Sequence, residues 1–267
     1  MESIPPSDPG RVIDWSRASA DYAQHRQGYP ERLWEWLESQ GVGGVGQRVV
    51  DLGTGTGLVA RPLAARGARV VGVDIAAGQV AWAQKLADEA RLDARFAVAS
   101  AEATGLRSGW AGSVTASQCW LYFRQPAAAD EVRRLLAPGG RLATMHLCWL
   151  PREDAIARAS EALVLQHNPA WTAGDWSGVV PEVPAWSREQ GFRVVAKTVF
   201  DVRLPYTREG WRGRFRACRG VGASLDPDAV AAFDAEHDAL LSREFGDAFE
   251  VLHRVDAHVY EPAAGPS

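Results

Sequence analysis

The segment from Val49 to Gly57 combines residue types that suit binding of a charged small ligand. It reads Val-Val-Asp-Leu-Gly-Thr-Gly-Thr-Gly, an apolar run that ends at Asp51 and enters a loop with glycine at every second position. Glycine lets the backbone turn sharply and approach a ligand closely, and the N-terminus of a following helix offers free N–H groups. A carboxylate at Asp51 repels a pyrophosphate but suits a ligand that carries an ammonium group.

A second acid follows about twenty residues later, where Val70-Val71-Gly72-Val73 ends at Asp74. A carboxylate at the end of the second strand of such a unit can accept both ribose hydroxyls of a nucleoside. The glycines run G-x-G-x-G, whereas the dinucleotide fingerprint is G-x-G-x-x-G. An NAD-dependent oxidoreductase therefore remains an alternative that this spacing disfavours, and a tight turn that binds nothing is a second one.

The elements around this loop alternate between strands and helices. Strands are expected at 48–52, 69–73, 94–99, 113–117 and 141–147, with helices between them at 57–66, 77–91 and 127–136. This alternation predicts a parallel sheet with helices on both faces. Polar helices at 14–25 and 31–40 precede the first strand, the second beginning after Pro30 and ending before Gly41.

Beyond residue 150 the alternation gives way to a helical region. Helices are expected at 152–167, 207–222 and 227–245, a connection rich in proline, glycine and tryptophan at 168–184, and strands at 192–200 and 248–259. With no internal repeat or long linker, residues 1–267 are expected to form a single domain with helical additions.

Composition excludes several classes of protein. The chain has 29 Lys+Arg and 33 Asp+Glu, a net charge of −4, which argues against general nucleic-acid binding. No apolar run approaches the roughly 18 residues that a membrane helix needs, and residues 1–10 lack the apolar core of a signal peptide, so a cytoplasmic location is expected. The 3 cysteines fit neither a disulfide framework nor a zinc site, so no metal is expected.

The chain resembles the class I S-adenosylmethionine-dependent methyltransferases, through Asp51–Gly57 together with Gly72–Ile75. Matches continue in order at 99–106, 114–118 and 132–140, and residues 21–30 resemble the N-terminal cap of small-molecule members such as those like trans-aconitate methyltransferase. The resemblance is specific over residues 14–147.

The resemblance implies a Rossmann-like α/β fold. Its sheet is doubly wound, mostly parallel and seven-stranded, with the last strand antiparallel. N-terminal cap helices precede it, and helical lid insertions follow the fifth strand and separate the last two strands. Residues 14–147 would form the cofactor-binding core, and residues 150–245 would contribute the acceptor pocket and lid.

The implied cofactor is S-adenosyl-L-methionine, with S-adenosyl-L-homocysteine as product. Asp51 would bind the methionine amino group, Asp74 the ribose hydroxyls, and Ile75 would pack on the adenine. The further implied cofactor residues are the loop positions Gly53, Thr54, Gly55 and Gly57, the adenine-side pair Ala101 and Glu102, the methionine-side pair Ser117 and Gln118, and the cap residues Tyr22 and Arg26.

Two departures from the family limit what carries over. Ser113 stands where an Asp is frequent, and Leu121-Tyr122 replaces a His-aromatic pair after the fourth strand. No catalytic role of that histidine transfers to Leu121. His146, at the end of the fifth strand, where open α/β sheets bind ligands, is therefore the candidate base, with a hydrogen-bonded structural histidine as the alternative.

The expected reaction is methyl transfer to a small-molecule acceptor, an aromatic or carboxylate-bearing metabolite, by in-line substitution driven mainly by positioning. A protein that binds the cofactor without catalysis is the alternative, and a monomer or homodimer is expected. Of the 11 tryptophans, seven fall between residues 110 and 211, which predicts an aromatic acceptor pocket. The residues expected to bind the acceptor are Trp120, Tyr122, His146, Trp149, His167, Trp171, Trp176 and Arg216. For the tryptophans the alternative is core packing, and for Arg216 a helix face paired with acids.

Overall fold

The computed structural model describes residues 7–263. The sequence predicts no signal peptide in residues 1–10, and the first six of these lie outside the described residues. The strands are β1 (Arg48–Leu52), β2 (Arg69–Asp74), β3 (Ala94–Val98), β4 (Ala111–Ser117), β5 (Leu136–Trp149), β6 (Phe192–Thr207) and β7 (Ala248–Pro262). The helices are α1 (Ser19–His25), α2 (Glu31–Ser39), α3 (Ala60–Ala65), α4 (Ala77–Glu89), α5 (Gln125–Leu135), α6 (Ala155–His167), α7 (Ala185–Glu189), α8 (Arg208–Arg216) and α9 (Pro227–Glu244), with 3-10 turns η1 (Trp15–Ala18) and η2 (Trp120–Tyr122).

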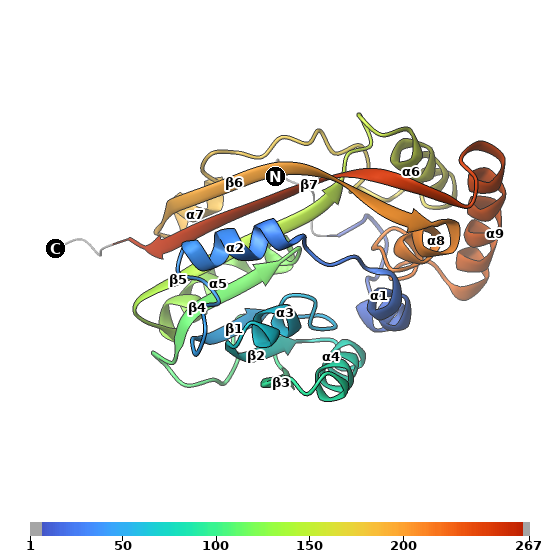
Figure 1. The fold of residues 1–267 in the computed structure, drawn as a ribbon. Coiled ribbons are helices and arrows are strands. Elements are labelled where there is room, and N and C mark those ends of the chain that lie inside the picture. The colour runs from blue at the N-terminus through green and yellow to red at the C-terminus, as the bar shows by residue number, and fades with distance from the viewer. Residues whose placement is uncertain (1–6, 264–267) are drawn as a thin grey trace. The chain divides into compact units, whose positions relative to one another are not determined.

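The seven strands form one sheet in the order β3-β2-β1-β4-β5-β7-β6. The pairs β3·β2, β2·β1, β1·β4 and β4·β5 are parallel. Figure 1 shows β7 pointing opposite to β5 and β6, between which it is inserted. The expected mostly parallel, seven-stranded sheet with an antiparallel last strand is therefore confirmed. The strand order reverses between β1 and β4, the place where open α/β sheets bind ligands beyond the carboxyl ends of their strands.

The chain divides into two compact units, each built from three separate segments. The sheet unit comprises residues 28–146, 181–199 and 255–263, and the helical unit comprises residues 7–27, 147–180 and 200–254. Strands β5, β6 and β7 each contribute residues to both units.

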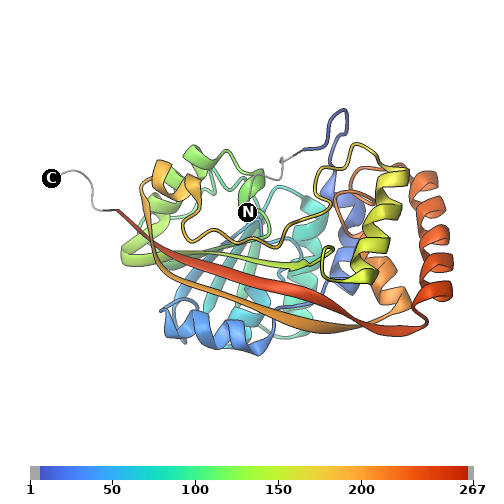
Figure 2. The ribbon, with the colours of Figure 1, turned by 90° about the horizontal axis from the view of Figure 1, so that it is seen from above.

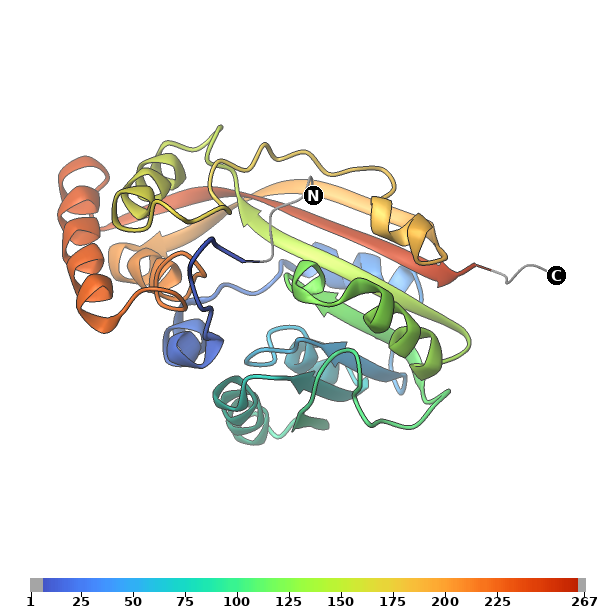
Figure 3. The ribbon, with the colours of Figure 1, turned by 180° about the vertical axis from the view of Figure 1, so that it is seen from behind.

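One apolar core of the sheet unit lies on the face that α5 covers. Val50, Leu52 and Val114 of the sheet pack with apolar residues of α5, and Trp120 packs against Trp186 of α7 at 4.4 Å between ring centroids, with the two rings tilted. Figures 1 and 3, which view the molecule from opposite sides, show α2 in front of the sheet in one and α5 in front in the other. Helices thus cover both faces of the sheet, as the alternating pattern predicts.

In the helical unit, α6, α8 and α9 lie side by side (Figure 2), and α1 packs on α8. The close approach of α1 requires glycine at position 213, because a Cβ there would lie 2.2 Å from His25 Cδ2. The apolar interior includes Trp211, Phe215 and Phe233, which are all fully buried.

Several elements differ in extent from the sequence expectation. α3 begins at Ala60 rather than at residue 57, because Gly53, Gly55 and Gly57 all have positive φ and the loop continues past them. α8 ends at Arg216 rather than at residue 222, β6 extends to Thr207, and α7 follows the connection at 168–184 without having been expected.

Gly72 offers a test of how tightly β2 packs against the glycine loop. A Cβ at position 72 would lie 2.6 Å from Thr54 Oγ1 and 2.7 Å from Phe96 Cδ1. We expect Gly72→Ala to lower the free energy of unfolding by about 1–3 kcal/mol, the usual effect of overpacking. Gly44→Ala, where a Cβ meets nothing within 4 Å, is the matched control. Equal urea midpoints for the two variants would contradict the packing described here.

Candidate functional site

Asp51 is a buried carboxylate at the carboxyl end of β1, with 1% of its surface exposed. Its Oδ1 accepts a hydrogen bond from Thr115 Oγ1 at 2.6 Å, and its Oδ2 accepts one from Thr54 Oγ1 at 2.7 Å. Within residues 7–263 no cation forms an ion pair with it. Burial raises the pKa of Asp51 to about 6, against the lowering effect of the two hydroxyl donors. A ligand ammonium group would supply the missing positive charge.

Asp74, at the end of β2, is held by the backbone of two neighbouring segments. Its Oδ2 accepts the N–H of Gly55 at 2.9 Å, and its Oδ1 accepts the N–H of Ala76 at 2.9 Å. Burial raises the pKa of Asp74, while these N–H groups lower it. The contact with Gly55 fixes the glycine loop against β2. Each carboxylate oxygen can accept a further hydrogen bond, which suits ribose hydroxyls.

The surface beyond the ends of β2 and β3 has an exposed apolar side chain where an adenine would need one. Ile75 directly follows Asp74 and is 71% exposed, an unusual exposure for a large aliphatic side chain. Ala101 is buried. Glu102 accepts hydrogen bonds from the Ser100 hydroxyl and, at 2.8 Å, from the N–H of Arg124, the residue that precedes α5.

The end of β4 supplies two further polar residues. The Ser117 hydroxyl lies 2.7 Å from the Tyr29 hydroxyl. Gln118 has a φ of 63°, in the left-handed region that non-glycine residues rarely adopt, and its N–H donates to Met145 O at 3.0 Å. Strained backbone of this kind is concentrated at functional sites. The next residue, Cys119, packs closely against Gly53. A Cβ at position 53 would lie 2.7 Å from the Cys119 sulfur.

His146 follows Met145 on β5. Met145 pairs in register with Ser117, the last residue of β4. His146 Nδ1 lies 2.9 Å from Oδ1 of Asp256 on β7, and the His146 side chain is 13% exposed. Although burial raises the pKa of Asp256, the charge and hydrogen bond of His146 hold it below its usual value. An ionised Asp256 can only accept, so His146 Nδ1 carries the proton of this hydrogen bond, and Nε2 is the ring nitrogen that can exchange a proton with a ligand.

The tryptophans expected to line a pocket lie in the interiors of the two units. Trp120 belongs to the core of the sheet unit, and Trp149 and Trp171 belong to the core of the helical unit. Trp176 is also buried. The indole N–H of Trp149 donates to Glu161 at 2.5 Å, whereas those of Trp120, Trp171 and Trp176 have no partner among the described residues. Core packing accounts for these side chains, so an acceptor role for them stays a prediction, as it does for the partly buried Tyr122.

The remaining predicted residues belong to the helical unit. The Arg26 guanidinium lies 5.2 Å from the centre of the Tyr22 ring. His167 Nε2 lies 3.2 Å from Glu236. Arg216 is fully engaged, because its guanidinium nitrogens contact Asp21, Glu209 and Asp234 at 3.1, 2.6 and 2.6 Å. Arg216 thus has the acid-paired environment that was the alternative to acceptor binding.

Sequence reasoning missed two residues that position the predicted ones. Thr115 pairs in register with Asp51 across β1 and β4 and donates to its carboxylate. Asp256 orients His146 from a strand more than 100 residues away in the chain. One sequence signal could have indicated Asp256. Polar residues alternate along β7 at Asp256, His258 and Tyr260, so their side chains lie on one face of the sheet.

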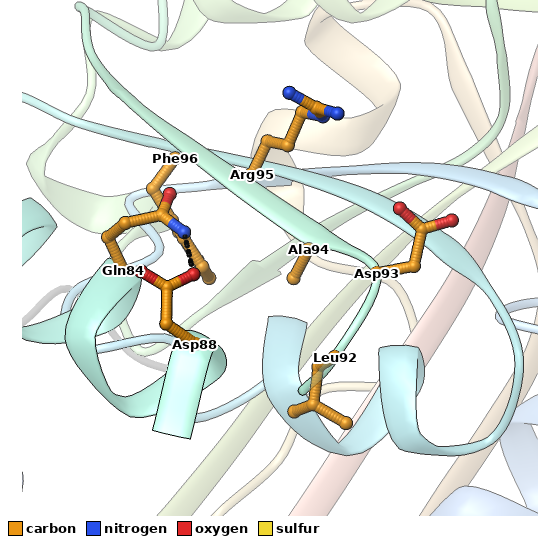
Figure 4. A pocket seen from close by; sticks show the side chains of 7 residues that line it. All are labelled: Gln84, Asp88, Leu92, Asp93, Ala94, Arg95 and Phe96. Carbon is orange, nitrogen blue, oxygen red and sulfur yellow. Dashed lines mark hydrogen bonds between the residues drawn. The ribbon is translucent and has the colours of Figure 1, made fainter. Parts of the chain in front are cut away.

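A separate hollow lies between α4 and the start of β3 (Figure 4), where Gln84 Nε2 donates to Asp88 Oδ1 at 2.8 Å. Because it is at the amino end of β3, it lies at the sheet edge opposite to Asp51 and Asp74, and we assign it no role. No group of three or more potential metal ligands occurs among the described residues. Nor does any helix in this part of the chain combine the length and apolar character needed to cross a membrane.

The residues of the sheet unit fit S-adenosylmethionine. The buried, cation-free carboxylate of Asp51, the backbone-held Asp74 and the exposed Ile75 lie at the ends of neighbouring strands β1 and β2. Gly53 and Gly55 both have positive φ, a backbone conformation that glycine adopts without strain and that gives the loop its path between β1 and α3.

Comparison with known proteins agrees with this site. Residues 50–144 match the family model described as a methyltransferase domain. An uncharacterised methyltransferase of Mycobacterium tuberculosis is 30% identical over 152 residues, 56% of this chain and 57% of that protein. A ubiquinone biosynthesis O-methyltransferase of Pseudomonas aeruginosa is 29% identical over 163 residues, 60% of this chain and 69% of that one. The chain thus spans a little more than half of the length of the mycobacterial relative.

A solved structure shares the fold over most of the chain. The S-adenosylmethionine-dependent methyltransferase from Geobacter sulfurreducens, in complex with S-adenosyl-L-homocysteine, superposes with a TM-score of 0.54 at 20% identity and covers 94% of this chain and 100% of its own. Residues 50–144, which extend from β1 into β5, thus match a methyltransferase domain, as the sequence motifs predict.

The raised pKa of Asp51 has a measurable consequence for stability. A carboxyl whose folded-state pKa rises from 3.8 to about 6 makes a stabilising contribution below pH 3.8 that is lost as the pH rises through 6. We therefore expect the stability of Asp51→Asn relative to the wild type to increase between pH 4 and pH 8, by about 3 kcal/mol at most. Urea unfolding across this range measures it. A pH-independent difference, like that expected for the exposed control Asp88→Asn, would refute the pKa assignment.

Proposed function

We propose that this protein transfers the methyl group of S-adenosylmethionine to a small-molecule acceptor. The observation that carries this proposal is the Asp51 carboxylate, buried without a counter-cation beside Asp74 at the switch point of the sheet. When bound, this cofactor supplies a methyl group activated by a sulfonium leaving group. The match of residues 50–144 to a methyltransferase domain and the fit of the site support the proposal.

The residues of the sheet unit have distinct roles in holding the cofactor. Asp51 binds the ammonium group, Asp74 accepts the ribose hydroxyls, and Ile75 covers one face of the adenine. The remaining contacts come from the backbone of the glycine loop and from the chain after β3 and β4, at Gly53, Thr54, Gly55, Gly57, Ala101, Glu102, Ser117 and Gln118. Tyr22 and Arg26 are the remaining residues that the resemblance assigns to the cofactor.

The acceptor is a small molecule that reacts through a hydroxyl group. His146 removes its proton through Nε2, while Asp256 holds the ring in the tautomer that leaves Nε2 unprotonated. The 2.9 Å contact between the two side chains supports this arrangement, and the similarity to an O-methyltransferase supports an oxygen nucleophile. Residues 150–245 contribute the acceptor pocket and lid, and positioning supplies most of the rate enhancement.

Cofactor binding provides the first test. We expect Asp51→Asn and Asp74→Asn each to weaken S-adenosylhomocysteine binding at least about tenfold, since each removes a charge-assisted contact. Below pH 6, binding to the wild type should release a proton, because a ligand ammonium group lowers the pKa of Asp51. Calorimetry in two buffers of different ionisation enthalpy measures both effects.

The exposed variant Asp88→Asn is the control for calorimetry, and NAD is the control ligand. If Asp51→Asn and Asp74→Asn bind S-adenosylhomocysteine as tightly as the wild type, or if NAD stabilises the protein more than S-adenosylhomocysteine does, the proposed cofactor site is wrong.

The role of His146 is tested by the pH profile of turnover on a panel of phenols and phenolic acids. His146→Gln should lower kcat about 10²–10⁴-fold on a phenol that must lose its proton, while binding of S-adenosylhomocysteine stays unchanged. Asp256→Asn should shift the ascending limb of the pH profile, which a merely structural residue would leave in place. If His146→Gln turns over these phenols at the wild-type rate, His146 is not the base.

A further inference from the structure

Helix α8 and the turn after it contain five arginines, and four of them are matched by acids. Arg208 lies 3.1 Å from Asp247, Arg212 and Arg216 contact Asp234, and Arg219 lies 3.0 Å from Asp8. Arg214 is different: among the described residues its guanidinium has no hydrogen bond and no ion pair, and its Nη1 is fully buried without a partner. With 5% of its surface exposed, Arg214 is a buried cation without a counter-ion.

Aromatic side chains of the same unit surround Arg214. Its guanidinium carbon lies 4.6 Å from the centre of the Trp149 ring, and Phe215 stacks on the same indole at 4.8 Å. Tyr206 packs against Trp211 at 4.8 Å, and its hydroxyl lies near enough to Arg214 that each charge affects the pKa of the other. Contact with an aromatic face attracts a cation by about 2 kcal/mol when both are desolvated, which is less than burying a bare charge costs.

The charges around Arg214 add to the imbalance. Burial, followed by the nearby charge of Arg26, lowers the pKa of Arg214 to about 10, so the guanidinium is still protonated at neutral pH. Burial also lowers the pKa of His253 to about 4, so this ring is neutral. Asp154 faces His253 but already accepts the N–H groups of Ile156, Ala157 and Leu252. Among the described residues no carboxylate forms an ion pair with the Arg214 guanidinium.

We propose that Arg214 binds a carboxylate group of the acceptor, an inference that rests on the proposed methyltransferase function. A planar guanidinium presents parallel N–H donors that match the two oxygens of a carboxylate. A bound carboxylate neutralises the buried charge, and the aromatic side chains around it suit an acceptor with a flat apolar body. The acceptor is therefore a hydroxyl-bearing aromatic or otherwise apolar carboxylic acid rather than a phenol without a carboxylate.

A carboxylate could come from the acceptor or from the methionine portion of the cofactor, and two probes separate these sources. Benzoate carries the carboxylate without the cofactor, benzamide is its neutral counterpart, and S-adenosylhomocysteine carries the cofactor's carboxylate. Arg214→Met removes the charge at similar length, and Arg214→Lys keeps the charge without the planar fork. Arg243→Met, on the exposed surface of α9, is the control.

We expect the wild type to bind benzoate in preference to benzamide, measured by ligand-observed NMR titration. Arg214→Met should weaken benzoate binding at least about tenfold, Arg214→Lys should retain part of it, and both should bind S-adenosylhomocysteine within twofold of the wild type. Equal affinity for benzoate and benzamide, or unchanged benzoate binding in Arg214→Met, overturns the proposal. Loss of S-adenosylhomocysteine binding in Arg214→Met with benzoate binding retained assigns the arginine to the cofactor and also overturns it.

A stability measurement separates a binding role from a structural one. If Arg214 binds a ligand, Arg214→Met should leave Tm unchanged or raise it, because residues that bind ligands often lower the stability of the free protein. A fall in Tm of more than about 5 °C together with unchanged benzoate binding would make Arg214 a structural residue. If the wild type fails to bind S-adenosylhomocysteine, the methyltransferase proposal fails, whatever Arg214 does with benzoate.

Discussion

The sheet unit is organised around one carboxylate that is removed from water without a partner cation. The Asp51 side chain at the end of β1 is held only by hydroxyl donors, from Thr115 across the strand pair and from Thr54 in the glycine loop. These contacts join β1, β4 and the loop at the point where the strand order reverses. Hydroxyl groups satisfy the oxygen lone pairs but leave the charge uncompensated, which is the basis for proposing that a ligand cation binds there.

Other features of the unit follow from this arrangement. Gly72 must lack a side chain because Thr54 and Phe96 occupy the space beside β2. Asp74 fixes the loop through the N–H of Gly55, so both acids hold the same backbone segment from different strands. Gln118 adopts its strained conformation where β4 ends, beside β5. The binding groups are thus placed by strand register, which is rigid, and by a loop whose path only glycine permits.

The predictable part of the structure was the part encoded by neighbouring residues. The run into Asp51, the glycines and the run into Asp74 specify strand, loop and strand locally, and the structure has β1 and β2 there. The contact between His146 and Asp256 joins strands far apart in sequence, so local pattern could not reveal it. Thr115 became visible only once the register of β1 and β4 was known.

In the helical unit, residue type alone could not distinguish residues that bind a ligand from residues that only pack or form ion pairs. Helical spacing indicated a basic face that includes Arg216, but only the packing of α1 and α9 shows that acids engage it. The neighbouring Arg214, on another face of α8, has no such partner. The tryptophan count could not separate core from pocket, because the same indole area serves both purposes.

The interleaving of the two units along the chain has a consequence for how the protein is made. Residues of β7 complete both units, and the helical unit also needs residues 7–27 from near the N-terminus. During synthesis neither unit can close until β7 has left the ribosome, although the parallel strands β1 to β5 emerge much earlier. The early sheet must therefore wait with one side uncovered, the situation in which unfinished chains depend most on chaperones. In this fold the completion of both units depends on β7, which follows the other described strands in the chain.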